Sequence, residues 1–222
     1  MRKARLGMSA TGLRLGVASE GTFGPHPVVP FMPAGMEFLV FVDDDRKIII
    51  TESAVSEATN FDHLVVVPFT SIEMFLERIG FPAHGLIVRP NAGALVAALR
   101  KGISSKYELD RAIINAASTS PDGKARLDTD MRAHFNPTRM NSLAALAQRL
   151  GRRLATLCSA CGNPGLGRTE TRHGLPCEDC DAPTQMIAAE IFSCPSCDFQ
   201  EYQARFDGLL KAPVRYCPEC NP

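Results

Sequence analysis

The sequence predicts an α/β protein, a mixed sheet with flanking helices, followed by two small zinc-ribbon units. Three observations predict this arrangement. Apolar, β-branched segments alternate with helical patterns over the first 157 residues. All eight cysteines come later, after residue 157. The chain has 222 residues, enough for one medium domain and a small one. We therefore expect an α/β domain over 1–157, with tandem ribbons over 158–222.

The first part of the chain contains a regular succession of patterns. In order, these predict a helix over 1–12, a strand over 13–19, a hairpin of 38–42 and 47–51, a strand over 64–67, a helix over 72–79, a strand over 86–88, helices over 91–100 and 105–116, an extended or helical segment over 125–134, and a helix over 137–157. No linker separates the last helix from the first cysteine. The two domains are thus expected to pack together.

Capping residues mark several of these boundaries. Gly12 and Gly80 follow helical patterns, where a left-handed residue commonly ends a helix. Thr70 and Glu73 have the spacing of a capping box, and Ser105 has the position of a second cap. Asn136 precedes a proline, which is favoured at the first helical position.

The charge balance bears on partners and location. Lys and Arg number 24, as do Asp and Glu, and residues 151–222 hold 7 basic against 9 acidic side chains. Four thiolates with one Zn²⁺ add two further negative charges per site, so the ribbon region is acidic and nucleic acid is not an expected partner. No apolar run approaches the roughly 20 residues of a membrane span, and no signal-peptide pattern begins the chain. A cytoplasmic protein without a membrane partner is expected.

The cysteines form four Cys-x-x-Cys pairs separated by 15, 13 and 19 residues. In a reducing compartment such pairs predict metal ligands rather than disulfides, here two structural Zn²⁺ ions. The spacing favours pairing neighbours, with one unit over 158–180 and another over 194–220. Redox chemistry at one pair is the alternative. The expected ligands are Cys158, Cys161, Cys177, Cys180, Cys194, Cys197, Cys217 and Cys220.

Residues 20–27 form the first candidate catalytic segment. Glu20 follows an expected strand, and His26 lies in a loop with two glycines and two prolines. A carboxylate and an imidazole beside backbone N–H groups suit a metal ligand or a general base. Turn geometry alone would also explain the glycines and prolines. Both interpretations remain open for this loop.

Residues 126–139 form the second candidate segment. If extended, Asp128 and Asp130 project to one side, a spacing suited to Mg²⁺. If helical, Asp130 and His134 share a face. A solvated charged segment leading into a capped helix is the alternative to a site. The expected substrate-binding side chains are Arg126, Arg132, Asn136 and Arg139.

Asp43 to Asp45 are interpreted as the tip of the expected hairpin rather than as a metal cup, since Asp favours turns.

Three stretches together resemble an uncharacterised bacterial family known as a domain of unknown function. They are EGTFGPHP at 20–27, TDMRAHFNPTRM at 129–140, and the cysteine-rich tail with GLPCEDC at 174–180 and CPECNP at 217–222. The resemblance covers nearly the whole chain and implies no reaction. It also implies a further segment upstream of Met1, part of which would belong to the α/β domain.

Two hypotheses for function follow. In the first, the protein is a metal-assisted hydrolase or transferase for a phosphate-bearing or nucleotide-like small molecule. Glu20, Asp128 and Asp130 would then hold Mg²⁺, and His26 or His134 would move protons. In the second, the protein is a non-enzymatic zinc-ribbon adaptor that binds another protein through the acidic tail. Convergence of the two candidate segments on one pocket would favour the enzyme.

Overall fold

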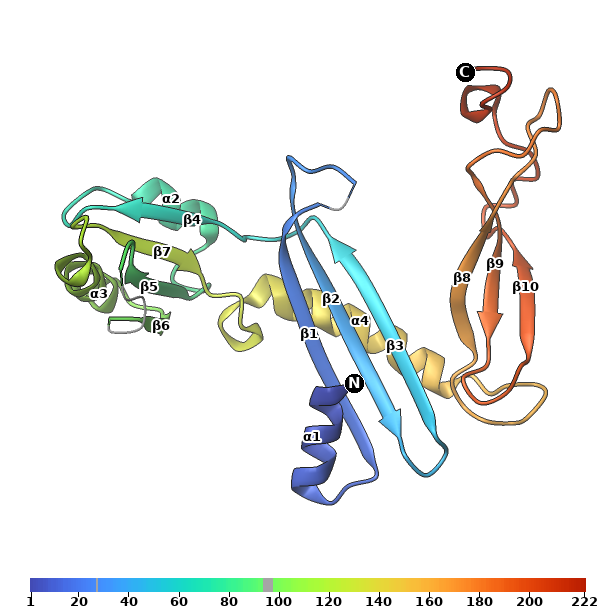
Figure 1. The fold of residues 1–222 in the computed structure, drawn as a ribbon, viewed down its shortest axis with the longest axis horizontal. Coiled ribbons are helices and arrows are strands. Elements are labelled where there is room, and N and C mark those ends of the chain that lie inside the picture. Colours follow the sequence, from blue (N-terminus) through green and yellow to red (C-terminus); the bar gives the residue numbers. More distant parts are fainter. Residues whose placement is uncertain (27, 94–97) are drawn as a thin grey trace. The chain divides into compact units, whose positions relative to one another are not determined.

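The computed structural model describes residues 1–26, 28–93 and 98–222. It has α/β architecture with three separate sheets (Figure 1). The chain folds into two compact units, each with its own internal packing. Unit 1 comprises residues 1–18, 40–51 and 148–222, and unit 2 comprises residues 19–39 and 52–147. The expected boundary after residue 157 does not coincide with this division, and the two-domain arrangement stays a prediction.

The three-stranded sheet of order β1-β2-β3 contains residues of both units. Its strands are β1 (Leu15–Pro25), β2 (Pro33–Asp43) and β3 (Ile48–Ser56). The expected hairpin is confirmed. Its tip is built as predicted, because the buried Asp43 accepts hydrogen bonds from the N–H groups of Asp45 and Arg46 at 3.0 and 2.9 Å.

The interpretation of residues 20–27 as a loop is wrong for most of its length. Strand β1 continues to Pro25, and the chain turns only after His26, whose N–H donates to the carbonyl of Met32 at 2.7 Å. Proline and glycine are tolerated here because β1 is an edge strand and Pro25 is its last residue. Pro27 lies outside the described residues.

Unit 1 contains helix α1 (Arg2–Thr11), which ends as predicted at Gly12 with φ of 70°. Ala4 and Met8 of α1 pack against Val42 of β2. The cysteine-rich tail adds an antiparallel sheet of order β10-β9-β8 and a 3-10 turn. These elements are β8 (Gly167–His173), β9 (Ile187–Ser193), β10 (Gln200–Ala204) and η2 (Val214–Tyr216).

Unit 2 contains a four-stranded sheet of order β4-β7-β5-β6 in which neighbouring strands run antiparallel. Its elements are β4 (His63–Val66), α2 (Glu73–Ile79), β5 (Leu86–Pro90), β6 (Arg100–Ile103), α3 (Lys106–Thr119) and β7 (Ala125–Thr129). Strands β4 and β5 run parallel to each other because each is antiparallel to β7 between them. The expected β-α-β unit is therefore present, but split by a third strand.

The core of unit 2 lies between this sheet and helices α2 and α3. Leu127 of β7, Leu86 and Val88 of β5, and Leu109 of α3 are all fully buried within it. The predicted cap of α3 is confirmed, since the Ser105 hydroxyl accepts the N–H of Glu108 at 3.3 Å. Alternate residues of β7 face the core, so its polar residues lie on the opposite face of the sheet.

Two expected features of unit 2 differ from the structure. Ile72 rather than Thr70 occupies the N-cap of α2, without a side-chain hydrogen bond, so the capping box is wrong. The helix expected over 91–100 falls partly on residues 94–97, which lie outside the described residues. Its last residue, Arg100, begins β6 instead.

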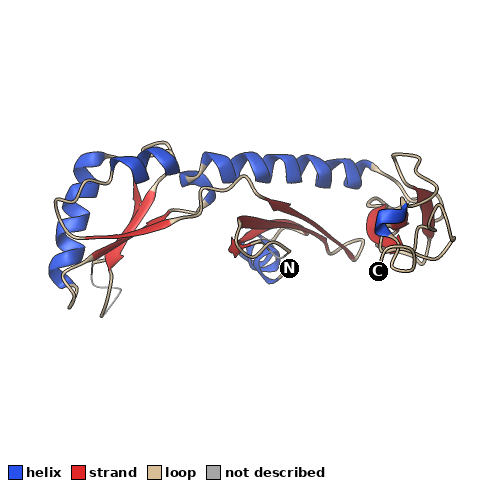
Figure 2. Ribbon diagram, turned by 90° about the horizontal axis from the view of Figure 1, so that it is seen from above, coloured by secondary structure: helices blue, strands red, loops and turns tan. Residues whose placement is uncertain are grey.

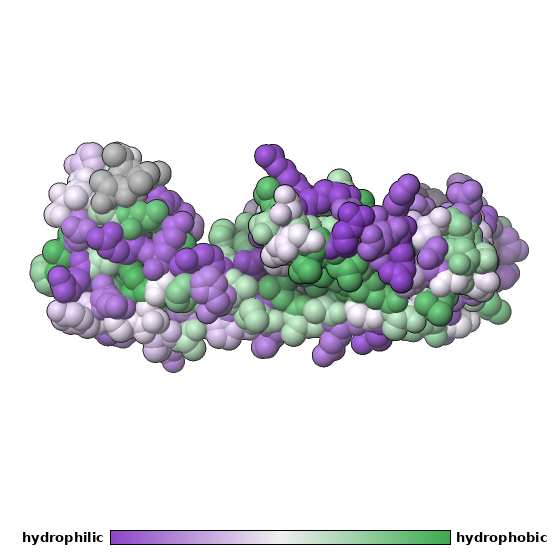
Figure 3. All heavy atoms as spheres, turned by 90° about the horizontal axis from the view of Figure 1, so that it is seen from below, coloured by the Kyte–Doolittle hydropathy of each residue, from purple (hydrophilic) through white to green (hydrophobic). Residues whose placement is uncertain are grey.

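Helix α4 (Pro137–Ala155) has 19 residues and is the longest described helix (Figure 2). The predicted cap is confirmed, since the buried Asn136 accepts the N–H of Arg139 at 2.9 Å. Leu146 and Leu150 of its apolar stripe are buried. None of the described helices combines the length and the apolar character that crossing a bilayer requires. Hydrophilic side chains are distributed over the face shown in Figure 3.

Candidate functional site

The eight cysteines form two clusters, but not the clusters that spacing favoured. One contains Cys158, Cys161, Cys194 and Cys197, and the other contains Cys177, Cys180, Cys217 and Cys220. The first Cys-x-x-Cys pair thus joins the third, and the second joins the fourth. The predicted units over 158–180 and 194–220 are therefore wrong, although the eight predicted ligands and the number of sites agree with the structure.

Strand pairing explains this crossed arrangement. In the antiparallel β8–β9 pair, Gly167 lies opposite Ser193, so the pair that precedes β8 meets the pair that follows β9. The second pair lies in the connection from β8 to β9, at the far end of both strands. There an isolated bridge joins Cys177 to Ala212, which leads to the last pair. The spacing of the cysteine pairs gives only the chain length between them and does not show which strands pair with each other.

The sulfur geometry fits a tetrahedral metal. In each cluster all sulfur atoms lie within 4.8 Å of one another. The distances Cys158–Cys197, Cys161–Cys194 and Cys180–Cys217 are 3.8, 3.7 and 3.6 Å. Zn–S bonds of about 2.3 Å in a tetrahedron separate the sulfur atoms by about 3.8 Å. Four soft sulfur donors at this separation suit Zn²⁺, which would stabilise the fold with no position open to substrate.

Hydrogen bonds from backbone N–H groups lower the pKa of some of the cysteine thiols, which favours the thiolate form that binds metal. Burial raises the pKa of Cys158, but the N–H groups of Cys161 and Ala160 outweigh it and bring the pKa to about 7. At Cys217 the N–H of Cys220 is the main cause that lowers the pKa to about 7. The N–H of Phe199 lowers the pKa of Cys197, but burial and the neighbouring sulfurs together outweigh it and raise the pKa to about 12. Without a metal, the four thiols of a cluster therefore cannot all ionise near neutral pH.

The clusters are tied to the rest of unit 1 by packing. Cys158 and Cys194 are buried with Leu166, and Phe192 and Phe199 pack against them. At Gly165, φ is 106° and an added Cβ would lie 2.4 Å from Ile50 of β3. The chain between the first Cys-x-x-Cys pair and β8 thus lies directly against β3, and a side chain at residue 165 would push this chain segment away from the strand.

The predicted carboxylates of unit 2 are each paired with arginine. Asp128 lies on the polar face of β7, where it accepts from Arg89 at 3.0 Å and from Arg126 at 2.8 Å. Asp130 is fully buried and accepts from Arg132 at 2.6 Å and from the N–H of Gly102 at 3.0 Å. Burial raises the pKa of Asp130, but the bonds from Arg132 and Gly102 lower it more, so the net shift is downward.

The predicted acid/base residues lie elsewhere. Glu20 is an exposed residue of β1. The Nδ1 atom of His26 accepts the N–H groups of Val28 and Val29, both at 3.1 Å, which is a turn-stabilising role. His134 is exposed in the 3-10 turn η1 (Ala133–Phe135), with its ring 4.4 Å from that of Phe135. The alternative in which Asp130 and His134 share a helical face is therefore wrong.

Among the described residues, the groups of three or more His, Cys, Asp or Glu that could share an ion are the two cysteine clusters. Glu20, Asp128 and Asp130 are in neither group. Because Mg²⁺ is often held by only one or two carboxylates, the predicted Mg²⁺ site stays a prediction.

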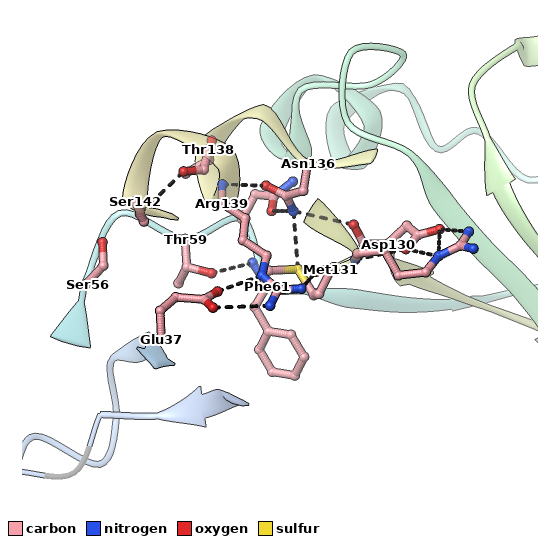
Figure 4. Close-up of polar contacts among 12 residues, drawn as sticks. Glu37, Ser56, Thr59, Phe61, Asp130, Met131, Asn136, Thr138, Arg139 and Ser142 are labelled. Carbon is pink, nitrogen blue, oxygen red and sulfur yellow. Dashed lines mark hydrogen bonds and ion pairs between the residues drawn. The ribbon is translucent and has the colours of Figure 1, made fainter. Parts of the chain in front are cut away.

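The two predicted segments meet instead at Arg139, which lies beside Gly21 and Phe23. Figure 4 shows Arg139 with Glu37 and Met131. The guanidinium of Arg139 binds Glu37 of β2 through two bonds, Nε–Oε1 at 2.6 Å and Nη2–Oε2 at 3.1 Å. It also donates to the carbonyl of Met131 and lies 5.2 Å from the ring centroid of Phe23. Glu37 is 3% and Arg139 is 13% exposed. Burial and two-point geometry make this an ion pair that excludes water.

The neighbouring residues complete this cluster. An added Cβ at Gly21 would lie 2.7 Å from the Arg139 Nη2 atom and from both Glu37 oxygens. Glycine is thus required where β1 passes the pair. Asn136 donates to the side-chain oxygen of Asn60 at 2.8 Å. The sequence did not identify Glu37, and its one signal was a charged residue between apolar neighbours directly before the strand expected over 38–42.

Comparison with known proteins identifies the family of the chain. The model of the family described as "Domain of unknown function (DUF6671)" matches residues 3–222. No curated protein and no solved structure shows a significant match to the chain. Because the family model covers nearly every residue, including both predicted segments and all eight cysteines, the chain belongs to the DUF6671 family.

Proposed function

We propose that this protein is a zinc-stabilised, non-enzymatic adaptor that binds a basic protein partner through residues 205–210. The observation that carries the proposal is Phe206, which is 95% exposed in a turn that follows β10 and precedes Cys217 in sequence. Leu210 in the same segment is 80% exposed. Large apolar side chains displayed together are typical of protein interaction sites.

The turn that displays Phe206 is held by its neighbours. Arg205 and Asp207 form an ion pair with bonds of 2.9 and 2.5 Å, and Arg205 also donates to the Ile187 carbonyl at 2.7 Å. Gly208 has φ of 66°, and its N–H donates to the Arg205 carbonyl at 3.1 Å. Because the flanking side chains are fixed, Phe206 is presented outward at a small cost in conformational entropy on binding.

Charge indicates the kind of partner. Residues 158–222 contain five Lys and Arg against nine Asp and Glu. Each cluster filled with Zn²⁺ would add two negative charges, so residues 158–222 as a whole would be acidic. A complementary partner would have an apolar pocket with a basic rim, which favours a protein over nucleic acid or another polyanion.

The enzyme hypothesis has less support. The three arginines proposed to neutralise phosphate each bind a carboxylate of the same unit: Arg126 binds Asp128, Arg132 binds Asp130 and Arg139 binds Glu37. A guanidinium that is already paired offers less attraction to phosphate, and a carboxylate that is already paired offers less to Mg²⁺. An adaptor needs neither group to be unpaired.

A photo-crosslinking experiment tests the adaptor. A photoreactive amino acid replaces Phe206 in the zinc-loaded full chain, expressed in cells that normally contain the protein. We expect one predominant cross-linked protein, which disappears when Leu210→Asp is added and decreases at high ionic strength. The matched control places the same amino acid at Phe31, which is 87% exposed but lies in unit 2.

Two results would contradict the proposal. One is a set of cross-linked proteins that is the same at positions 206 and 31 and insensitive to Leu210→Asp. The other is turnover of nucleotides or phosphoesters by the purified protein with Mg²⁺ that is lost in Glu20→Ala, because the first hypothesis alone assigns a role to that carboxylate.

A further inference from the structure

A second exposed aromatic residue lies in unit 2, in the turn between β4 and α2 (Figure 1). The Thr70 N–H donates to the Val67 carbonyl at 3.3 Å, which closes a four-residue turn with Pro68 and Phe69 at its centre. Phe69 has φ of 67° and is 94% exposed. A left-handed residue at the third position of such a turn is normally glycine or asparagine.

Phe69 therefore adds no stability to a single folded chain. Its backbone conformation is unfavourable for a bulky residue, and its ring buries almost no surface. Glycine at this position would remove the strain and the exposed ring together. A residue with both disadvantages is expected where the ring is used by a contact outside the chain.

A cavity of about 310 Å³ lies directly beside this ring. Its apolar lining includes the buried residues Val66, Ile72 and Ile113 and the half-exposed residue Ile114. A cavity of roughly 150 Å³ is sufficient for a benzene molecule. The space next to Phe69 is thus large enough to accept a phenyl ring.

We propose that the protein forms a two-fold homodimer in which Phe69 of each copy enters this cavity of the other. The projecting ring and the apolar recess lie side by side on one surface of one unit. Such a patch is self-complementary, which is the requirement for a two-fold interface. A different protein would need only the ring or only the recess, so the presence of both favours a second copy.

The charged residues at the rim are compatible with this pairing. Lys106 forms an ion pair with Glu73, and Asp110 lies one helical turn further along α3. All three line the cavity. Because the rim carries both signs, a two-fold arrangement can place Lys106 of one copy near Asp110 of the other.

The proposal is independent of the adaptor function, and the mass of the zinc-loaded full chain in solution tests it. Sedimentation velocity over a wide concentration range should show a species of twice the 24.1 kDa chain mass. Phe69→Gly should raise the dimer dissociation constant by about 30-fold or more, since a central aromatic anchor is lost from each half. Ile114→Arg, which fills the cavity with a charged side chain, should do the same.

Phe69→Gly is chosen because it relieves the left-handed backbone, so the variant should keep or increase its melting temperature. The control is Phe206→Asp, which removes an equally exposed ring in unit 1 and should leave the dimer intact. A wild-type chain that is monomeric at every concentration would overturn the proposal. A dimer that persists unchanged in Phe69→Gly, or one that Phe206→Asp dissociates, would overturn it as well.

Discussion

Residues 158–222 and unit 2 both contain groups that can carry negative charge, but these charges are compensated differently in the two regions. In the tail, each cluster brings four sulfur atoms within 4.8 Å of one another. In unit 2, Glu37, Asp128 and Asp130 each contact an arginine. A cluster of like groups requires an external cation, whereas a set of ion pairs is complete in itself. The cysteine clusters of the tail are therefore the groups that could hold a metal ion.

Removal of zinc should cause the largest loss of folded structure, and it should affect the tail but not unit 2. Because zinc-binding free energies of about 10–16 kcal/mol are folding free energies in small zinc domains, chelation under reducing conditions should unfold residues 158–222. Hydrogen exchange should then show loss of protection in β8, β9 and β10, with protection kept in β5, β7 and α3. Equal loss in all six elements would mean that the zinc holds both units together.

Breaking the Glu37–Arg139 pair should give the next largest effect. Arg139→Ala leaves the carboxylate of Glu37 buried without its partner, which should lower the free energy of unfolding by about 3–5 kcal/mol. Urea denaturation of the zinc-loaded protein measures it. The double variant Glu37→Leu with Arg139→Met should lose less than Arg139→Ala alone. A greater loss in the double variant would show that the charges themselves, and not their mutual compensation, stabilise the site.

Acid should weaken the Asp130 pair. The folded-state pKa of Asp130 is lowered, so its contribution is fully present above the unfolded pKa of about 3.9 and is lost as pH falls through the lower folded value. Asp130→Asn should lower the free energy of unfolding by about 1–3 kcal/mol at pH 7 and by less at pH 3. Urea midpoints of both proteins across this range measure the difference. A constant difference would contradict the pKa shift.

An exposed pair should matter least. Asp62 and Arg78 lie 2.8 Å apart but are 34% and 60% exposed, so Asp62→Asn should change the free energy of unfolding by less than about 1 kcal/mol. Urea denaturation alongside the Arg139 variants provides the measurement. An effect as large as that of Arg139→Ala would show that burial is not what distinguishes the two pairs.

The sequence was informative about several local features. The Cys-x-x-Cys pairs, the caps at Ser105 and Asn136, and the hairpin tip at Asp43 each depend on residues within a few positions of one another. Side-chain chemistry and turn geometry act at that range, so these predictions agree with the structure.

Partners distant in sequence could not be predicted. Glu37 and Arg139 are 102 positions apart, and no periodicity links them. The crossed cysteine pairing depends on the β8–β9 register, which spacing cannot reveal. The loop interpretation of segment 20–27 was wrong because its glycines indicated a turn, whereas Gly21 is needed for the close passage of β1 beside the Glu37–Arg139 pair. In each case tertiary packing decided what local pattern left open.

Zinc stoichiometry in two matched quadruple variants tests the crossed clusters most directly. In one variant serine replaces Cys158, Cys161, Cys194 and Cys197, which form one cluster. In the other variant serine replaces two cysteines of each cluster, namely Cys158, Cys161, Cys177 and Cys180. Native mass spectrometry should find one tightly bound Zn²⁺ in the first variant. It should find no tightly bound Zn²⁺ in the second, because neither cluster keeps four thiolates. One tightly bound Zn²⁺ in the second variant and none in the first would contradict the crossed arrangement.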